Sequence, residues 1–217
     1  MVLTVAIDEA ARGPLIGSMV MAGVLVDEED IESLKSIGVK DSKLLSQKKR
    51  VALFKKINSI VKKHKILVVS PKEIDAALES DDLNLNWLEA QTSAKIINAL
   101  KPDKIIIDCP SNNVSAYKKY LLNLLDNKKV DAVVEHKADL NYVECAAASI
   151  LAKVTREEEI EKIKKEAGDF GSGYMADPKT AKFLKENAEK HPDIFRKTWA
   201  PYKKMLAMKK QKKMDEF

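Results

Sequence analysis

Residues 2–26 read VLTVAIDEAARGPLIGSMVMAGVLV, and this stretch decides the fold. It contains two apolar runs, 2–7 and 19–26, on either side of a polar segment that is broken by glycine and proline. Such a pattern predicts a strand, a tight turn and a second strand. The acidic pair Asp8 and Glu9 directly follows the first run, so we expect carboxylates at the carboxyl end of the first strand.

The rest of the chain alternates between strand-like and helix-like patterns. Short apolar or β-branched runs predict further strands, and apolar residues at helical spacing predict the helices between them. Strands that alternate with helices indicate parallel pairing, whereas the first three strands are close enough in sequence to pair antiparallel. The further strands are expected at 66–69, 105–107 and 132–134, and the helices at 27–36, 47–61, 83–100, 117–125 and 142–167, from Pro71 and from Pro178 onward.

These patterns predict an α/β fold in which helices flank a mixed five-stranded sheet. We expect two parts, a catalytic domain at 1–167 and a C-terminal helical region with a basic tail at 168–217. Ser46 is the predicted cap of the helix at 47–61, and the buried face of that helix should include Val51.

The composition excludes several classes of protein. Hydrophobic residues make up 45% of the 217 residues and charged residues 33%, so the chain can bury a core and disorder is not expected. No apolar run approaches the roughly 20 residues that are needed to cross a bilayer. Two cysteines are too few for a disulfide scaffold or a four-ligand zinc site. Because the start reads as a strand and not as a signal peptide, we predict a cytoplasmic protein with no membrane partner.

The net charge of +5 is compatible with a nucleic-acid partner. Nearly all of the positive charge comes from lysine, which neutralises phosphate well but is poorly suited to reading bases. We therefore expect recognition of the nucleic-acid backbone in preference to its sequence. The only arginines are Arg12, Arg50, Arg156 and Arg196.

Four carboxylates, Asp8, Glu9, Asp108 and Asp139, are the candidate catalytic residues. Asp8 and Asp108 each end an apolar strand, which is where ligands bind in an α/β sheet. Carboxylates gathered in one place repel one another, and Mg²⁺ or Mn²⁺, which prefer hard oxygen ligands, relieve that repulsion. Two such ions about 4 Å apart activate a water on one side of a phosphodiester and stabilise the leaving oxygen on the other.

Each carboxylate also has an ordinary explanation. Strands often end in Asp as the start of a turn. Asp139 could cap a helix that begins at Leu140. A zinc site is not indicated, because His64, His136 and His191 lack the spacing of metal ligands.

Six stretches of sequence together resemble one family. They are IDEAARGP at 7–14, KDSK at 40–43, ID at 107–108, EHKAD at 135–139, AASILAK at 147–153, and GSGY at 171–174 with DPKT at 177–180. In this order and spacing they resemble ribonuclease HII, and the compact form with a helical C-terminus is similar to the archaeal enzymes. The resemblance runs from about Val2 to Trp199.

The resemblance implies the ribonuclease H fold and a metal-dependent endonuclease. It assigns Asp8, Glu9, Asp108 and Asp139 as the catalytic carboxylates, which bind two Mg²⁺ or Mn²⁺ ions during catalysis. The reaction it implies is hydrolysis of the RNA strand of RNA/DNA hybrids, leaving 5′-phosphate and 3′-hydroxyl ends. The same chemistry is expected at single ribonucleotides embedded in duplex DNA.

The resemblance also implies a set of substrate-binding residues. The turn Ala11-Arg12-Gly13 matches the family's Gly-Arg-Gly turn, which senses the ribose 2′-hydroxyl. Tyr174 matches the tyrosine that packs on the sugar next to the ribonucleotide. Contacts with the phosphate backbone are expected from Lys40, Ser42, Lys43, Ser149 and Lys153, the last two on one face of the helix at 142–167.

Ala11 departs from the family pattern, which has glycine at this position. If its φ is positive, alanine is disfavoured there by roughly 1 kcal/mol or more. If its φ is negative, only a methyl group is added near the substrate backbone. Recognition of an RNA-to-DNA junction is the function that this departure affects most.

Two other functions stay open. One is a hybrid-binding protein of the same fold with weakened catalysis, although all four carboxylates are present. The other is a nuclease of the same superfold that acts on DNA junctions, although the arginine turn and the GSGY loop belong to 2′-hydroxyl recognition.

The lysine-rich C-terminus contains Gln211, Met214 and Phe217, which resemble a truncated motif that binds the sliding clamp of replication. The second aromatic residue of that motif is absent, and a frayed terminus is the alternative. We expect the protein to be a monomer.

Overall fold

The structure, a computed structural model, describes residues 2–40 and 42–215 and is built on a five-stranded sheet. The strands are β1 (Thr4–Ala10), β2 (Met19–Val26), β3 (Lys63–Val69), β4 (Lys104–Asp108) and β5 (Asp131–Glu135). They lie in the order β3-β2-β1-β4-β5. β2 pairs antiparallel with both β1 and β3, while β4 pairs parallel with both β1 and β5. The predicted mixed sheet is therefore confirmed.

Helices connect the strands and extend beyond them. They are α1 (Glu28–Ser36), α2 (Gln47–Ile60), α3 (Pro71–Glu79), α4 (Leu85–Leu100), α5 (Val114–Leu124), α6 (Ala138–Asn141), α7 (Val143–Ala167), α8 (Pro178–Asn187) and α9 (Ala200–Asp215), with short 3₁₀ turns η1 (Ser42–Leu44) and η2 (Pro192–Ile194). None of the described helices is both long and apolar enough to cross a membrane.

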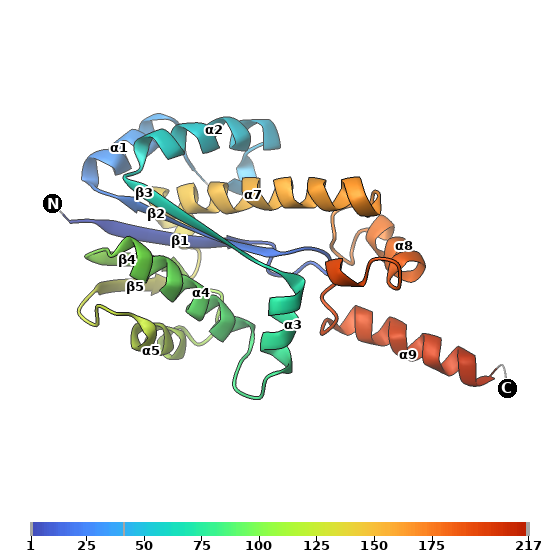
Figure 1. The fold of residues 1–217 in the computed structure, drawn as a ribbon. Coiled ribbons are helices and arrows are strands. Elements are labelled where there is room, and N and C mark those ends of the chain that lie inside the picture. The colour runs from blue at the N-terminus through green and yellow to red at the C-terminus, as the bar shows by residue number, and fades with distance from the viewer. Residues whose placement is uncertain (1, 41, 216–217) are drawn as a thin grey trace.

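The sheet is covered on both faces. Helices α1, α2 and α7 lie on one side of it, and α4 and α5 lie on the other (Figure 1). Side chains alternate between the faces along β1, so that Ala6 packs towards α7 whereas Val5 and Ile7 pack towards α4. The central strand β1 is thus buried on both sides.

β1 is longer than its apolar run suggests. It continues through Asp8 and Glu9 to Ala10, because all three residues pair with β2. The carboxylates expected at the carboxyl end of this strand are found there, but the strand continues past Asp8 to Ala10. Because neighbouring residues of a strand face opposite ways, Asp8 lies on the α7 side of the sheet and Glu9 lies on the α4 side.

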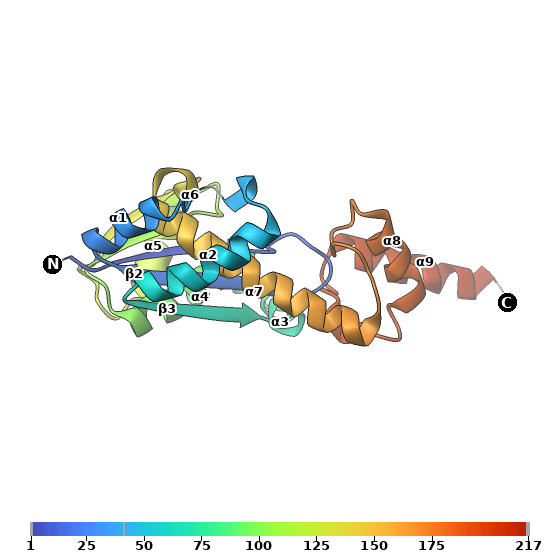
Figure 2. The ribbon, with the colours of Figure 1, turned by 90° about the horizontal axis from the view of Figure 1, so that it is seen from above.

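A third apolar cluster forms at one end of the molecule. It joins Leu15 and Ile16, which follow β1, to Phe170, Phe183 and Phe195 of the C-terminal part. Helix α7 runs along the sheet and reaches this end, where α8 and α9 lie beyond its last turn (Figure 2). The loop after β1 is consequently packed against the C-terminal region.

For α2, the sequence predicts the start of the helix correctly but is wrong about one residue of its buried face. Ser46 caps α2 as predicted, its side chain accepting a hydrogen bond from the N–H of Lys49. Val51, in contrast, is exposed, and Leu53 and Ile57 form the buried face of α2. The prediction for Val51 is wrong because this side chain lines an open pocket between α2 and α7 and does not pack in the core.

Candidate active site

Three carboxylates meet at one edge of the sheet. Asp8 lies in β1, Asp108 ends β4, and Asp139 lies in the first turn of α6. The carboxyl ends of β1 and β4 share an edge because these strands are parallel neighbours, and α6 follows β5, the next strand. One ligand oxygen from each residue lies within 4.8 Å of the other two, an arrangement that could hold a metal ion.

Glu9 is outside this group of three. Its side chain is half-buried and leaves β1 on the side of α4. Its pKa is raised well above the usual range, first by burial and then by the negative charges of Asp8, Glu89 and Asp108. Glu9 is therefore close enough to feel the charges of Asp8 and Asp108, although it leaves the sheet on the other face.

Burial and mutual repulsion both disfavour the charged forms of Asp8 and Asp108. Burial raises the pKa of Asp8 to about 6, and the charge of Asp108 adds to this, whereas Ser149 and Lys153 oppose it. The pKa of Asp108 is likewise raised, by burial first and then by the charge of Asp139. Without a cation, the folded protein holds its carboxylates at the cost of part of its stability.

Asp139 is explained neither by helix capping nor by hydrogen bonding. The cap of α6 is Lys137, no side chain caps this helix, and Asp139 lies within its first turn, so the capping alternative is wrong. Its Oδ1 atom is buried and has no hydrogen-bond partner among the described residues, while Oδ2 lies 3.5 Å from Nζ of Lys43. A buried carboxylate oxygen without a partner, beside two further carboxylates, fits a hard divalent cation such as Mg²⁺ or Mn²⁺.

A buried hydrogen-bonded chain supports Asp8 from α7. Ser149 and Ser42 are fully buried, and their hydroxyl oxygens lie 2.9 Å apart. Lys153 donates a hydrogen bond from Nζ to Ser42, and Ser149 is hydrogen-bonded to Asp8. Both serine hydroxyls thus contact groups of the protein and not solvent.

The loop that carries Ser42 also brings lysines to the site. Arg50 of α2 holds this loop by donating to the carbonyl oxygens of Leu45, at 2.7 Å, and of Ser42, at 3.4 Å. Lys43 and Lys40 are both exposed on it. Lys43 consequently stands above Asp139 with its ammonium group open to solvent.

The turn that follows β1 lies next to Tyr174. Ala11 has a φ of +63°, which places it in the left-handed region that favours glycine. A methyl group on Gly13 would lie 3.8 Å from a ring carbon of Tyr174, whose side chain is exposed. The guanidinium of Arg12 points to α4, where Nε lies 3.0 Å from Glu89 and Nη2 donates to Asn86 at 2.8 Å.

Two buried residues of this neighbourhood were missed from the sequence. Glu89 is fully buried, and burial raises its pKa to about 7, although the charge of Arg12 opposes the rise. Glu89 lies four residues after Leu85 and seven before Ile96, which places it on the apolar face of α4. A charged residue at that spacing could have been recognised in the sequence as buried. Arg196, also fully buried, contacts residues more than 170 positions away, and no local pattern announces it.

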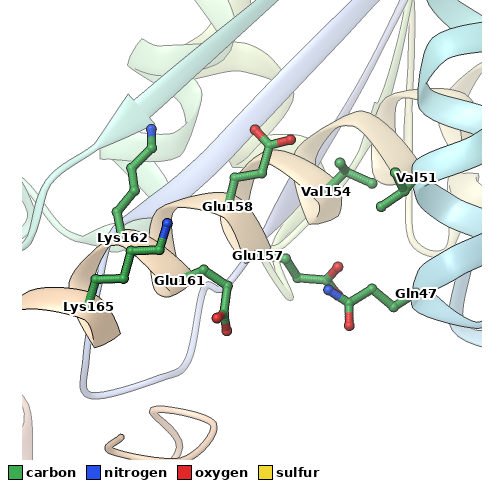
Figure 3. Close-up of a pocket in the computed structure, with 8 residues that line it drawn as sticks. All are labelled: Gln47, Val51, Val154, Glu157, Glu158, Glu161, Lys162 and Lys165. Atoms are coloured by element: carbon green, nitrogen blue, oxygen red, sulfur yellow. The ribbon is translucent and has the colours of Figure 1, made fainter. Parts of the chain in front are cut away.

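A separate pocket between α2 and α7 holds a second set of acidic side chains. Figure 3 shows that Glu157, Glu158 and Glu161 point in different directions there. Glu157 is paired with Arg50 at 2.5 Å. Within the described residues, only Asp8, Asp108 and Asp139 bring three potential ligands close together.

Comparison with known proteins agrees with this geometry. The sequence model of the family described as Ribonuclease HII matches residues 5–202. The chain belongs to this family. Ribonuclease HII of Pyrococcus furiosus is 46% identical over 97% of the chain and 96% of that protein. The chain is therefore an endoribonuclease, a hydrolase.

Solved structures share the fold. The crystal structure of ribonuclease H2 from Pyrococcus horikoshii OT3 matches with a TM-score of 0.84 and 40% identity, covering 94% of this chain and 96% of that one. The ribonuclease HII in a complex with PCNA from Archaeoglobus fulgidus matches with a TM-score of 0.81 and 39% identity, covering 90% and 93%. The fold is thus the ribonuclease H fold.

Removing divalent cations should make stability depend on the ionisation of Asp8. The pKa of Asp8 is higher in the folded protein, about 6, than its ordinary 3.8, so its contribution is full below pH 3.8 and is lost as the pH rises through 6. In EDTA, the free energy of unfolding of the unsubstituted protein should fall as the pH rises from 3.8 to 6. Asp8→Asn should make this fall smaller by about 2–3 kcal/mol. Urea unfolding at a series of pH values measures it.

Glu73→Gln is the control for this measurement. Hydrogen bonds from Ser70 lower the pKa of Glu73, so its contribution has the opposite sign and its loss should leave the fall in place. An Asp8→Asn variant with the slope of the unsubstituted protein would contradict the prediction.

Proposed function

We propose that this chain hydrolyses the RNA strand of RNA/DNA hybrids and also cuts at ribonucleotides embedded in duplex DNA. The observation that carries the proposal is the group of Asp8, Asp108 and Asp139, in which one buried oxygen of Asp139 has no partner among the described residues. Membership of the ribonuclease HII family supports the same activity.

The catalytic roles follow from the carboxylates. Asp8, Asp108 and Asp139, with Glu9 beside them, would hold two Mg²⁺ or Mn²⁺ ions. When bound, such ions activate a water and stabilise the leaving 3′-oxygen, which yields 5′-phosphate and 3′-hydroxyl ends. The protein itself fixes Asp8 through Ser149 and offsets part of the negative charge with Lys153.

Backbone phosphates would be bound mainly by the lysines that reach solvent. Lys40 and Lys43 are exposed, and Lys43 lies 3.5 Å from Asp139, close to where a scissile phosphate would sit. Ser42 and Ser149 were expected to contact phosphate, but both are fully buried. We infer that their role is to fix Asp8 and Lys153.

Selection of RNA would depend on the turn after β1. A protein distinguishes RNA from DNA by sensing the 2′-hydroxyl. The turn Ala11-Arg12-Gly13 begins directly after β1, the strand that carries Asp8, and Gly13 borders the exposed ring of Tyr174. This arrangement supports a turn that reads the ribose and a tyrosine ring that packs on the sugar, both near the end of the strand that carries Asp8.

A catalytically weakened hybrid-binding protein is not favoured. Such a protein would have no use for three neighbouring carboxylates, two of them buried, because the burial and mutual repulsion of Asp8 and Asp108 disfavour their charged forms. This group supports a protein that uses cations for cleavage.

A cleavage assay on three duplexes tests the function. With Mg²⁺ or Mn²⁺, the protein should cut a uniform hybrid and a duplex with one embedded ribonucleotide, but not a DNA-only duplex. Asp8→Asn and Asp139→Asn should each lower the rate by about 100-fold or more, because each removes a ligand. The exposed Asp131→Asn, in β5, is the matched control and should retain activity.

The other outcomes of this assay are equally informative. Cleavage of the DNA-only duplex would favour a DNA nuclease. Tight binding of the hybrid without cleavage in either metal would favour the binding protein.

Ala11→Gly should improve cleavage at a single embedded ribonucleotide more than cleavage of a uniform hybrid. Glycine adopts the φ of +63° without the penalty that alanine carries, about 1 kcal/mol. A single ribonucleotide offers only one correct register, so it should depend more on the turn. The ratio of kcat/KM on the two substrates measures the effect.

Lys101→Gly provides a matched control for this substitution. Lys101 also has a positive φ, +52°, but it lies at the end of α4, away from the carboxylates. It should change stability without changing the ratio. An equal improvement on both substrates, or none, in Ala11→Gly would refute the role of the turn.

We also propose that the C-terminus binds the sliding clamp through Gln211, Met214 and Phe217. Gln211 is exposed in α9, while the side chain of Met214 and all of Phe217 lie outside the described residues. The complex of the Archaeoglobus fulgidus relative with PCNA supports a clamp as a partner.

Deleting residues 211–217 should abolish binding to immobilised clamp while leaving hybrid cleavage in free solution unchanged. The reason is that residues 211–215 form the end of α9, a helix that extends away from the sheet (Figure 1). A pull-down in which the shortened chain still binds the clamp would remove the proposal.

A further inference from the structure

Arg196 is a fully buried arginine that lies between η2 and α9. Its guanidinium donates to three backbone carbonyl oxygens, from Nη2 to Ala11 at 2.7 Å, from Nη1 to Arg12 at 2.7 Å and from Nε to Gly17 at 3.0 Å. A single side chain therefore ties the turn after β1 to the C-terminal part of the chain.

Trp199 completes the hold on the turn. Its indole Nε1 donates to the carbonyl oxygen of Gly13 at 3.2 Å. The guanidinium carbon of Arg196 lies 4.9 Å from the centre of the Trp199 ring, close enough for a cation–π contact. The carbonyl oxygens of Ala11, Arg12 and Gly13 are thus all bound by residues 196–199.

The holding segment is itself anchored. Asp75 of α3 accepts hydrogen bonds from the N–H groups of Lys197, at 2.7 Å, and Thr198, at 2.9 Å, and from the Thr198 hydroxyl at 2.6 Å. The backbone N–H of Arg196 donates to Leu15 at 2.9 Å. The backbone around Arg196 is therefore held in place independently of the contacts that its side chain makes with the turn.

Stability alone does not account for this arrangement. In the described part of the chain, no carboxylate forms an ion pair with Arg196. Three carbonyl groups and one ring are therefore the direct partners of its buried charge, and the charges of Asp75 and Glu89 act from farther away. Apolar side chains of similar volume often stabilise a core as well as or better than buried charged networks. What an apolar side chain cannot do is fix two adjacent carbonyl groups at once.

The turn needs such support because Ala11 adopts a disfavoured conformation. A positive φ in a residue with a Cβ persists when the surroundings over-determine it. On its other side, Arg12 is held by Glu89 and Asn86 of α4. Among the described residues nothing accepts from the N–H groups of Arg12 and Gly13, so the turn keeps two donors for a ligand.

We propose that Arg196 is a positioning residue for ribose recognition: by binding the carbonyl groups of Ala11 and Arg12, it holds the turn in the geometry that senses the 2′-hydroxyl. The inference rests on the proposed function. Arg196 touches neither substrate nor cation, and Trp199 assists it through Gly13.

Arg196→Lys tests this, because lysine keeps the charge but lacks the planar fork that reaches two adjacent carbonyl groups. The ratio of kcat/KM on a single embedded ribonucleotide to that on a uniform hybrid should fall about tenfold, since small misplacements of a binding group cost large factors in rate. The rise in melting temperature on adding Mn²⁺ should stay as in the unsubstituted protein, because the carboxylates are untouched.

Leu184→Ala controls for general damage to the C-terminal region. Leu184 is buried in the apolar cluster that joins Leu15 and Ile16 to the C-terminal part. It belongs to α8 and makes no hydrogen bond with the turn. When each protein is assayed the same number of degrees below its own melting temperature, Leu184→Ala should leave the ratio of kcat/KM values unchanged. If Arg196→Lys lowers both activities in the same proportion as Leu184→Ala, the role of Arg196 is structural and the proposal is overturned.

Two further variants keep the test decisive. In an Ala11→Gly background the effect of Arg196→Lys should shrink by about threefold or more, because glycine needs less support in the turn. Trp199→Phe keeps the ring but removes its N–H donor, so it should lower the same ratio modestly, and an unchanged ratio contradicts the proposal even if Arg196→Lys does not fold. Failure of the unsubstituted protein to cut the hybrid would instead reject the proposed function.

Discussion

The repulsion between Asp8, Asp108 and Asp139 is the constraint on which the rest of the structure depends. Three ligand oxygens within 4.8 Å of one another repel, so the backbone that carries them must be rigid. β1 and β4, which carry Asp8 and Asp108, are inner strands of the sheet with helices on both faces. Burial raises the pKa of Asp8 and of Asp108, so the fold accepts a local loss of stability where a cation is to be bound. The polar chain from Ser149 to Lys153 limits that loss.

Much of the fold could be predicted from the sequence, because strand and helix periodicities reflect burial. The mixed sheet, the cap at Ser46, the start of α3 at Pro71 and the end of β4 near Asp108 follow from local patterns. The continuation of β1 past Asp8 to Ala10 could not be predicted, because charged residues are unfavourable in strands and pairing with β2 keeps Glu9 there. The exposure of Val51 could not be predicted from its apolar side chain, because this residue lines an open pocket between α2 and α7.

The candidate site divides in the same way. Motif spacing identified the carboxylates, but not that Glu9 leaves β1 on the face opposite Asp8, since that follows from the length of the strand. The φ of Ala11 was undecidable from the sequence, because it depends on hydrogen bonds made by Arg196, 185 positions away. The burial of Ser42 and Ser149 could not be predicted from their motifs, because it depends on how the loop at Ser42 packs on α7, and their contact with phosphate stays a prediction.

Asp8 lies in β1 and the turn begins directly after that strand, and this fixes the distance between them. Asp8 and Ala11 are three residues apart along an extended chain, which corresponds to about 10 Å. A backbone phosphate at the carboxylates and a ribose at the turn must then be near neighbours on one strand of the substrate, whatever its bases are. Because β1 cannot rotate within the sheet, only the turn can drift, and its carbonyl groups are bound by residues 196–199. By holding the turn, the C-terminal region thus keeps a constant distance between the carboxylates, where the phosphate is cut, and the turn, where the ribose is sensed. This constant distance is its contribution to selectivity.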